Sequence, residues 1–165
     1  MPGRFDMPQS IDNFLCTDLV TIEADASLAA LEARLDRPID YGVPVVTAGG
    51  RLRGVINPTD ILRASMQLGT RARHIPASEF CHRVRACLSS NSSLRRAQRL
   101  ILTRDLDSLL VLDTARRVVG IIFRSDLERH GLVPNRNSRW RRPMRHPDTA
   151  HHDSDRELFI EDERD

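Results

Sequence analysis

The sequence repeats itself at a fixed interval. The stretches "RGVINPTDIL" (53–62) and "VGIIFRSDLE" (119–128) share one construction, an apolar β-branched run that ends at polar residues. Gly54 recurs as Gly120 and Asp60 recurs as Asp126, and the distance along the chain is the same for both pairs. We call this distance the repeat offset. A unit this small cannot cover its own apolar face, so the two copies are expected to pack against each other as one globule.

Each copy predicts the same order of elements. Apolar residues at helical spacing predict a short amphipathic helix, and two β-rich runs joined by a polar turn follow it. A second helix is expected after the second run. A short extended segment, called the entry of the repeat, is expected before the first helix. The entries are expected at 18–22 and 83–87, the first helices at 26–36 and 92–102, the strand pairs at 41–56 and 107–122, and the second helices near 58–67 and 124–130.

The fold class that follows is α/β, with two β-α-β-β-α repeats related by pseudo-twofold symmetry. The chain length suits one such globule with a shared core. The expected organisation is an N-terminal extension (1–10), the first repeat (11–66), a connector (67–80), the second repeat (81–132) and a charged, flexible C-terminal tail (133–165).

The apolar pattern argues against a membrane protein. No apolar stretch approaches the ~20 residues that a membrane span needs, and the N-terminal residues carry acids and lack the apolar region of a secretory signal. The three cysteines are an odd number without CxxC spacing, which favours reduced, inert thiols over a disulfide framework. A cytoplasmic location is therefore expected.

The net charge of +2 hides two opposed blocks near the C-terminus. Residues 136–146, "RNSRWRRPMRH", carry five arginines around the single Trp, and the sequence beyond them is strongly acidic. Phosphate contacts and Trp stacking are one use for the basic block. Because the acidic run competes for the same arginines, nucleic acid is not an expected partner, and docking of the tail on the protein itself or on another protein is favoured.

No grouping of residues points to catalysis or to a metal. His74, Cys81, His82 and Cys87 are the nearest approach to a zinc set, but Cys81 and His82 are adjacent and the spacing fits no standard site. The pair His151-His152 lies in a charged tail, where solvation is the default. No Ser/His/Asp grouping, Walker loop or pair of carboxylates at catalytic spacing occurs, so an enzyme is not expected.

The residues after the first apolar run are those that begin a helix. Asn57 is a favoured N-cap and Pro58 a favoured first helical residue, which places the Asp60 carboxylate at the positive end of the helix. The free N–H groups of such a first turn also form an anion site, able to hold a phosphate. From the residues alone, capping is the favoured interpretation and binding the alternative.

With these motifs in place, the chain resembles a pair of CBS domains, the regulatory module named after cystathionine β-synthase. The resemblance covers roughly residues 11–132 and excludes the tail. It lies in "DLVTIEADASLAAL", "GVPVV" and "GVINPTDIL" in the first copy and in "SSNSSLRRA", "SLLVLD" and "GIIFRSDLE" in the second.

The resemblance implies binding of an adenosine-containing ligand. The family motif is Gly, apolar, any, Ser/Thr, any, any, Asp, in which the hydroxyl residue helps to bind phosphate and the Asp holds the ribose hydroxyls. Gly54, Val55 and Asp60 match it, and Asn57 stands where Ser or Thr is usual. Asn still donates a hydrogen bond, so the first site is weakened rather than lost.

The second copy departs further from the motif. Gly120, Ile121 and Asp126 match, but Phe123 occupies the Ser/Thr position, where it cannot cap a helix or bond a phosphate. Arg124 and Ser125 remain available to an anion. The first copy is therefore expected to be the better site. The segment "YGVP" (41–44) matches the one that lines the adenine pocket in the family, with Tyr41 at its edge. From the residues alone, a Val-Pro pair such as Val43-Pro44 in a strand is more often part of the core or of an edge strand. The residues assigned to ligand on this basis are Ile22, Tyr41, Gly42, Val43, Pro44, Asn57, Thr59, Asp60, Arg124, Ser125 and Asp126.

Two functions fit this set of residues. The favoured one is a free-standing regulatory protein that binds AMP, ADP, ATP or S-adenosylmethionine and passes its state to a separate, unknown partner protein. No cofactor is required for this, and a homodimer is expected because the family commonly pairs through its helices. The alternative is an interaction scaffold with degenerate ligand sites, which Asn57 and Phe123 favour and Asp60 and Asp126 oppose.

Overall fold

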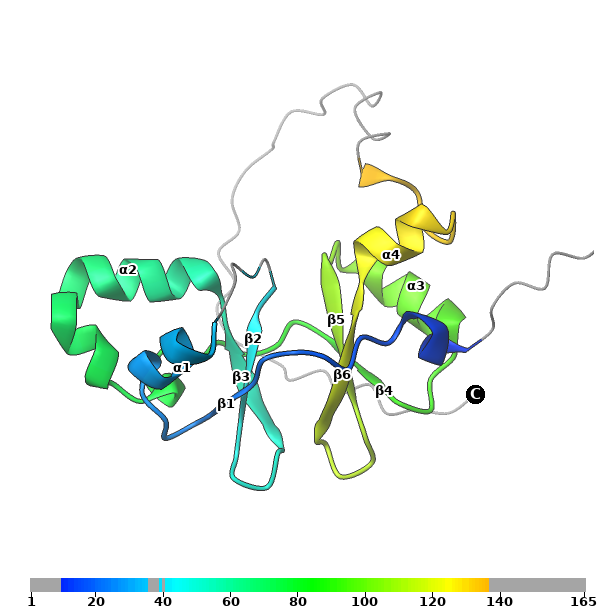
Figure 1. The fold of residues 1–165 in the computed structure, drawn as a ribbon. Helices are drawn as coiled ribbons and strands as arrows, with labels where there is room; N and C mark the ends of the chain where they lie inside the picture. The colour runs from blue at the N-terminus through cyan, green and yellow to red at the C-terminus, as the bar shows by residue number, and fades with distance from the viewer. Residues whose placement is uncertain (1–9, 36–38, 40, 137–165) are drawn as a thin grey trace, which may run out of the picture.

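A computed structural model describes residues 10–35, 39 and 41–136 of the chain (Figure 1). The expected N-terminal extension falls outside the described residues except for Ser10. The expected tail does so beyond Arg136, and with it most of the basic block, the acidic run and the pair His151-His152. Among the residues that the structure describes, none of the helices combines the length and apolar character needed to cross a membrane.

The predicted order of strand, helix, strand, strand, helix occurs twice, which confirms the fold class. The first repeat contains β1 (Ile22–Glu23), α1 (Leu28–Arg34), β2 (Val43–Val46), β3 (Leu52–Ile56) and α2 (Pro58–Leu68). The second contains β4 (Cys87–Ser89), α3 (Leu94–Thr103), β5 (Ser108–Leu112), β6 (Val118–Phe123) and α4 (Arg124–Arg129).

Two three-stranded sheets stand next to each other at the centre of the molecule, with the helices on the outside (Figure 1). Their strand orders are β1-β2-β3 and β4-β5-β6. In each sheet the first strand is parallel to the second and the second is antiparallel to the third. Each first helix supplies the crossover that a parallel pair of strands requires.

The first helix of each repeat begins at a serine. The Ser27 hydroxyl accepts a hydrogen bond from the Ala30 N–H at 3.4 Å, and the Ser93 hydroxyl accepts one from the Arg96 N–H at 3.4 Å. An N-cap of this kind satisfies one of the free donors of the first turn. The cap therefore recurs with the repeat.

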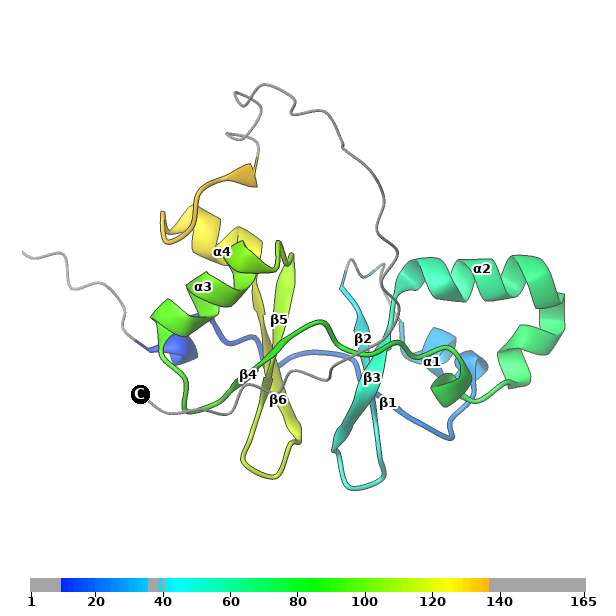
Figure 2. The ribbon, with the colours of Figure 1, turned by 180° about the vertical axis from the view of Figure 1, so that it is seen from behind.

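The repeats are joined by chain segments that cross from one half to the other (Figure 2). Cys16 pairs with Ile121 on β6, and His82 pairs with Val55 on β3, through two backbone hydrogen bonds of 2.7–2.9 Å in each case. The repeat offset relates Cys16 to His82 and Val55 to Ile121. The predicted pseudo-twofold symmetry thus extends to the contacts between the halves.

The two turns of the strand pairs meet at the symmetry axis. Arg51 forms a bridge with Arg117, its own counterpart at the repeat offset. On either side, the Leu52 N–H donates to the Arg116 carbonyl at 3.1 Å, and the Val118 N–H donates to the Gly50 carbonyl at 3.4 Å. The turns therefore add a second set of backbone contacts between the halves.

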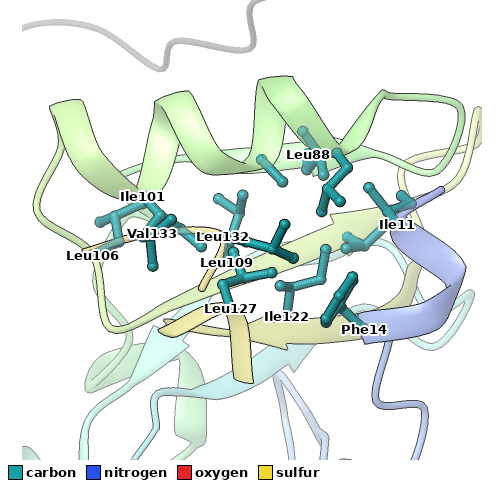
Figure 3. Close-up of a cluster of buried hydrophobic side chains, with 13 residues drawn as sticks. Ile11, Phe14, Leu88, Ile101, Leu106, Leu109, Ile122, Leu127, Leu132 and Val133 are labelled. Carbon is teal, nitrogen blue, oxygen red and sulfur yellow. The ribbon is translucent and has the colours of Figure 1, made fainter. Parts of the chain in front are cut away.

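Each half has its own hydrophobic cluster, and each cluster includes residues of one or two short 3-10 helices from outside its repeat. The 3-10 helix η1 (Ile11–Phe14) packs into the cluster of the second half through Ile11 and Phe14 (Figure 3). In the corresponding arrangement of the other half, η2 (Gly69–His74) and η3 (Ala77–Glu79) pack into the first cluster through Ala72 and Ala77. The expected connector is thus partly helical and belongs to the first core.

Candidate functional site

The motif of the first repeat builds a well-capped helix. β3 ends at Ile56, and the Asp60 carboxylate in the first turn of α2 accepts the Asn57 N–H through Oδ2 at 3.1 Å. The same oxygen lies 3.1 Å from Nε2 of His82, which arrives on the crossing segment. The Asp60 side chain is 12% exposed. The carboxylate therefore joins the helix start to the contact between the halves.

The motif glycines are required by the crossing segments. A Cβ on Gly54 would lie 2.5 Å from the His82 carbonyl oxygen, and one on Gly120 would lie 2.8 Å from the Cys16 carbonyl oxygen and 2.5 Å from Leu15. Side-chain atoms do not approach backbone oxygens that closely. The part of the motif that resembles a ligand signature is thus also the place where the halves touch.

The other assigned residues of the first repeat divide into core and surface. Ile22 and Val43 are fully buried in the first hydrophobic cluster. Pro44 is buried in β2, whereas Asn57 and Thr59 are exposed at the start of α2. The remaining residue, Gly42, packs against the Asn57 side chain, because a Cβ there would lie 3.2 Å from Oδ1 of Asn57.

A pocket of about 350 Å³ lies at the motif of the second repeat. Its walls come from the loop before β5, the junction of β6 with α4, the residues after α4, and one residue of the first repeat. The lining residues are Tyr41, Asp107, Ser108, Phe123, Arg124, Ser125, Glu128 and Arg136.

Tyr41 reaches this pocket from the first repeat. Its ring meets the Phe123 ring edge to face, with centroids 5.6 Å apart, and its hydroxyl accepts the Val20 N–H at 3.3 Å. The sequence assigned Tyr41 to the adenine pocket of the first copy. The structure places its ring on the second pocket, so an aromatic wall is made by both repeats.

The start of α4 differs from that of α2. Phe123 is at the N-cap position and makes no side-chain capping bond, as its chemistry predicts. Ser125 is exposed beside the pocket, and Asp126 pairs with Arg129 at 3.3 Å. Of these two residues, Ser125 lines the pocket and Asp126 does not.

A network of ion pairs forms the polar wall of the pocket. Arg124 is 3% exposed, and it donates through Nε to Glu128 at 2.8 Å and through Nη1 to Asp105 at 3.1 Å. Arg136 bonds Asp105 through Nη2 at 3.0 Å and Asp107 through Nη1. The Arg136 side chain is the main reason that the pKa of Asp105 is lowered, although desolvation opposes the shift.

Sequence reasoning assigned Arg124 but missed three members of this wall. Asp107 is the counterpart of Tyr41 at the repeat offset, so the offset was a signal that could have identified it. Glu128 lies one helical turn after Arg124, where the two side chains meet. Arg136 lies past the end of the repeat and is the first arginine of the basic block (136–146), which was expected to dock on the protein itself or on another protein and was not assigned to a ligand pocket.

The cysteines do not assemble into a metal centre. Within the described part of the chain, no group of three or more His, Cys, Asp or Glu residues is placed to hold a metal ion. The three thiols are free and partly buried. Burial raises the pKa of the Cys87 thiol, and the charge of Arg116 opposes that shift.

Comparison with protein families matches the CBS-domain model twice, at residues 11–67 and 77–132. The two matches together cover more than half of the chain, and their first residues are counterparts at the repeat offset. Comparison with the curated proteins found no match.

Solved structures of CBS proteins share the fold. CBSX2 in complex with AMP is 22% identical, with a TM-score of 0.60, over 74% of this chain and 96% of that one. A CBS domain protein from Streptococcus pneumoniae is 20% identical, with a TM-score of 0.60, over 72% of this chain and 83% of that one. The cytosolic domain of the Mg²⁺ channel MgtE in complex with ATP is 20% identical, with a TM-score of 0.63, over 74% of this chain but only 48% of that one.

Proposed function

The chain belongs to the CBS-domain family, and from this premise we propose that it is a regulatory module that binds an adenosine-containing ligand and signals to a partner protein. The single observation that carries the proposal is the pocket at the second strand-to-helix motif, with an aromatic wall and a charged wall. An aromatic face suits a base, and arginine suits a phosphate. A catalytic role is not part of the proposal.

Two of the similar structures support the choice of ligand. CBSX2 was solved with AMP and the MgtE domain with ATP, and both have this fold. AMP, ADP, ATP and S-adenosylmethionine are therefore the compounds to test. A neutral nucleoside, adenosine, separates recognition of the base and sugar from recognition of the phosphate.

The test is a thermal-shift screen of the full chain followed by titration calorimetry. A ligand that binds only the native state stabilises it by mass action, by about 2.7 kcal/mol at a concentration of 100 Kd. We expect at least one adenosine-containing compound to raise the unfolding temperature, and the rise to increase with the logarithm of the ligand concentration. No shift with any of them at millimolar concentration would leave the proposal without support.

The two repeats offer two candidate sites, and their ranking stays a prediction. Sequence reasoning favours the first repeat, where Asp60 would accept the ribose hydroxyls and where Asn57 and Thr59 would face the phosphate. The described pocket favours the second repeat. If the first site is used, Asp60→Ala is expected to weaken binding about 10- to 150-fold, the range for hydrogen bonds to a charged group, and Asp126→Ala to change it little. Losses of equal size would contradict the ranking.

The alternative function is a scaffold without ligand. The observation that favours it is that Oδ2 of Asp60 is already occupied by the Asn57 N–H and the His82 ring. A ribose hydroxyl would have to use Oδ1 or displace His82. His82→Ala distinguishes the two functions, because removal of a competitor strengthens ligand binding at Asp60, whereas a scaffold binds no adenosyl ligand in either form.

A further inference from the structure

The residues that follow the second repeat form one side of the second pocket. The family match ends at residue 132, and Arg136 lies beyond it. The main chain there is held in place: Leu132 and Val133 are buried in the second core, and the Leu132 carbonyl accepts a hydrogen bond from Nε2 of Gln98 at 2.6 Å. The Arg136 N–H donates to Oε1 of Glu128 at 3.1 Å. This short strap (132–136) therefore fixes Arg136 at the pocket.

Arg124 retains one unused donor in the same wall. Its Nε and Nη1 are bonded to carboxylates, but Nη2 is buried and has no hydrogen-bond partner among the described residues. A buried guanidinium nitrogen without an acceptor carries a desolvation cost, and such groups are rare in folded proteins. Arg124 lines the pocket, so a shift of its side chain that turned Nη2 toward an anionic ligand there would supply the acceptor.

The balance of charge in the wall depends on Arg136. Asp105, Asp107 and Glu128 carry three negative charges, and Arg124 and Arg136 carry two positive ones. Without Arg136, three carboxylates would face a single guanidinium. Such a wall would repel a phosphate, most of all at Glu128, whose side chain is 17% exposed, because solvent screens the more exposed Asp105 and Asp107.

From this geometry we infer that Arg136 is a specificity-determining residue of the second pocket: it neutralises the acidic wall and, together with Arg124, admits a ligand that carries a phosphate or diphosphate group. The inference rests on the proposed function for the identity of the rest of the ligand. It does not rest on it for the anion, because the two arginines recognise the phosphate whatever group is attached to it.

The experiment compares the full-length wild type with Arg136→Ala and Arg136→Lys, with pyrophosphate, AMP and adenosine as probes. Arg73→Ala is the matched control, since Arg73 forms an exposed ion pair with Glu32 at 3.1 Å in the first repeat. Titration calorimetry gives affinities, and unfolding without ligand verifies that each variant is folded. Arg136→Lys keeps the charge and guards against a folding defect in Arg136→Ala.

We expect Arg136→Ala to weaken pyrophosphate and AMP binding about tenfold or more, the order for loss of a charge-assisted hydrogen bond. Adenosine binding is expected to stay unchanged, Arg136→Lys to lie between the wild type and Arg136→Ala, and Arg73→Ala to match the wild type. Unchanged pyrophosphate and AMP binding in Arg136→Ala would overturn the inference, and so would a wild type that does not bind pyrophosphate. Tighter binding would also overturn it, because Arg136 would then be a plug that competes with the ligand.

The failure of one proposal is distinguishable from the failure of the other. Pyrophosphate binding that depends on Arg136, without binding of any adenosine-containing compound, supports the anion site and contradicts the proposed function. Binding of AMP and adenosine with equal affinity, unaffected by Arg136→Ala, supports an adenosine site and contradicts the role of Arg136.

Discussion

Gly54 and Gly120 occupy the points where the backbone of one repeat meets a segment from the other. At Gly54 the obstacle is the His82 carbonyl, which also accepts the Val55 N–H at 2.9 Å. A backbone oxygen cannot move aside in the way that a side chain can. The residue type at this position is therefore set by the contact between the halves, whether or not a ligand binds nearby.

Gly54→Ala tests this requirement. The new methyl group would lie 2.5 Å from the carbonyl oxygen, so the crossing segment must shift and its two hydrogen bonds to Val55 must lengthen. We expect a loss of about 1–3 kcal/mol in the free energy of unfolding, the usual cost of overpacking. Urea denaturation measures it. Gly49→Ala is the control, because a Cβ there lies 3.8 Å from its nearest neighbour; equal effects of the two substitutions would contradict the steric explanation.

Asp105 gives a prediction for acid pH. Its pKa is lowered in the folded state, chiefly by the hydrogen bond from Arg136. Because the pKa is lower in the folded protein, the ion pair stabilises the fold at pH values above the ordinary carboxyl pKa. This contribution to the free energy of unfolding is lost as the pH falls through the pKa of the folded state. Arg136→Ala is therefore expected to return the Asp105 pKa toward its ordinary value, as measured by NMR titration of the carboxyl carbon. An unchanged pKa would show that the pair does not persist in solution.

At the scale of elements, the sequence predicted correctly those helices and strands that depend on residues close together along the chain. Apolar residues at helical spacing, the Asn-Pro start of α2 and the β-rich runs joined by polar turns predicted four helices and the two strand pairs near their observed positions. The entries were less well placed, since β1 and β4 each begin only at the last residue of the predicted range. The short helices η1, η2 and η3 were not predicted, because they depend on packing against distant parts of the chain.

The candidate site shows the same division. The strand-to-helix motifs were found from sequence, but the position of Tyr41 on the second pocket depends on how the halves meet. The ion pairs of Arg124 and Arg136 bring together residues up to 31 positions apart. No periodicity or capping rule contains such a contact, so the charged wall required the structure.

The helix α2 presents an apolar surface to solvent. Leu62 is 63% exposed, Met66 is 80% exposed and Leu68 is 43% exposed, and Leu62 and Met66 lie one turn apart. Large apolar side chains grouped on one face of a helix are typical of an interaction surface. Together with the expected pairing of CBS modules through their helices, this makes α2 the proposed interface of a homodimer.

The double variant Leu62→Glu and Met66→Glu is expected to dissociate this dimer, because burying two carboxylates in an apolar interface is costly. Sedimentation velocity at micromolar concentration measures the change. Gln67→Glu is the matched control, since it adds a charge to an exposed position of the same helix without removing apolar surface. A wild type that sediments as a monomer would contradict the proposed dimer, and an unaffected dimer in the double variant would place the interface elsewhere.

At the scale of the whole molecule, each repeat completes the core of the other. η1 precedes the strands of the first repeat but packs in the second core, and η3, at the start of the second family match (77–132), packs in the first core. The exchange is symmetric, because Ala77 is the counterpart of Ile11 at the repeat offset. Two cores that share their elements in this way are expected to unfold together as one cooperative unit.

Ile11→Ala tests this cooperativity from the second core. Ile11 is fully buried there in the same cluster as Leu88 and Ile122 (Figure 3), so its truncation is expected to cost about 2–5 kcal/mol in the free energy of unfolding. If the halves unfold together, native-state hydrogen exchange must show the same loss of protection in β2 of the first repeat as in β5 of the second. Ile11→Val, which removes less, should shift both strands by a smaller but equal amount. A loss confined to β5 would mean that the two cores unfold independently, and the crossing segments would then be contacts between separate domains.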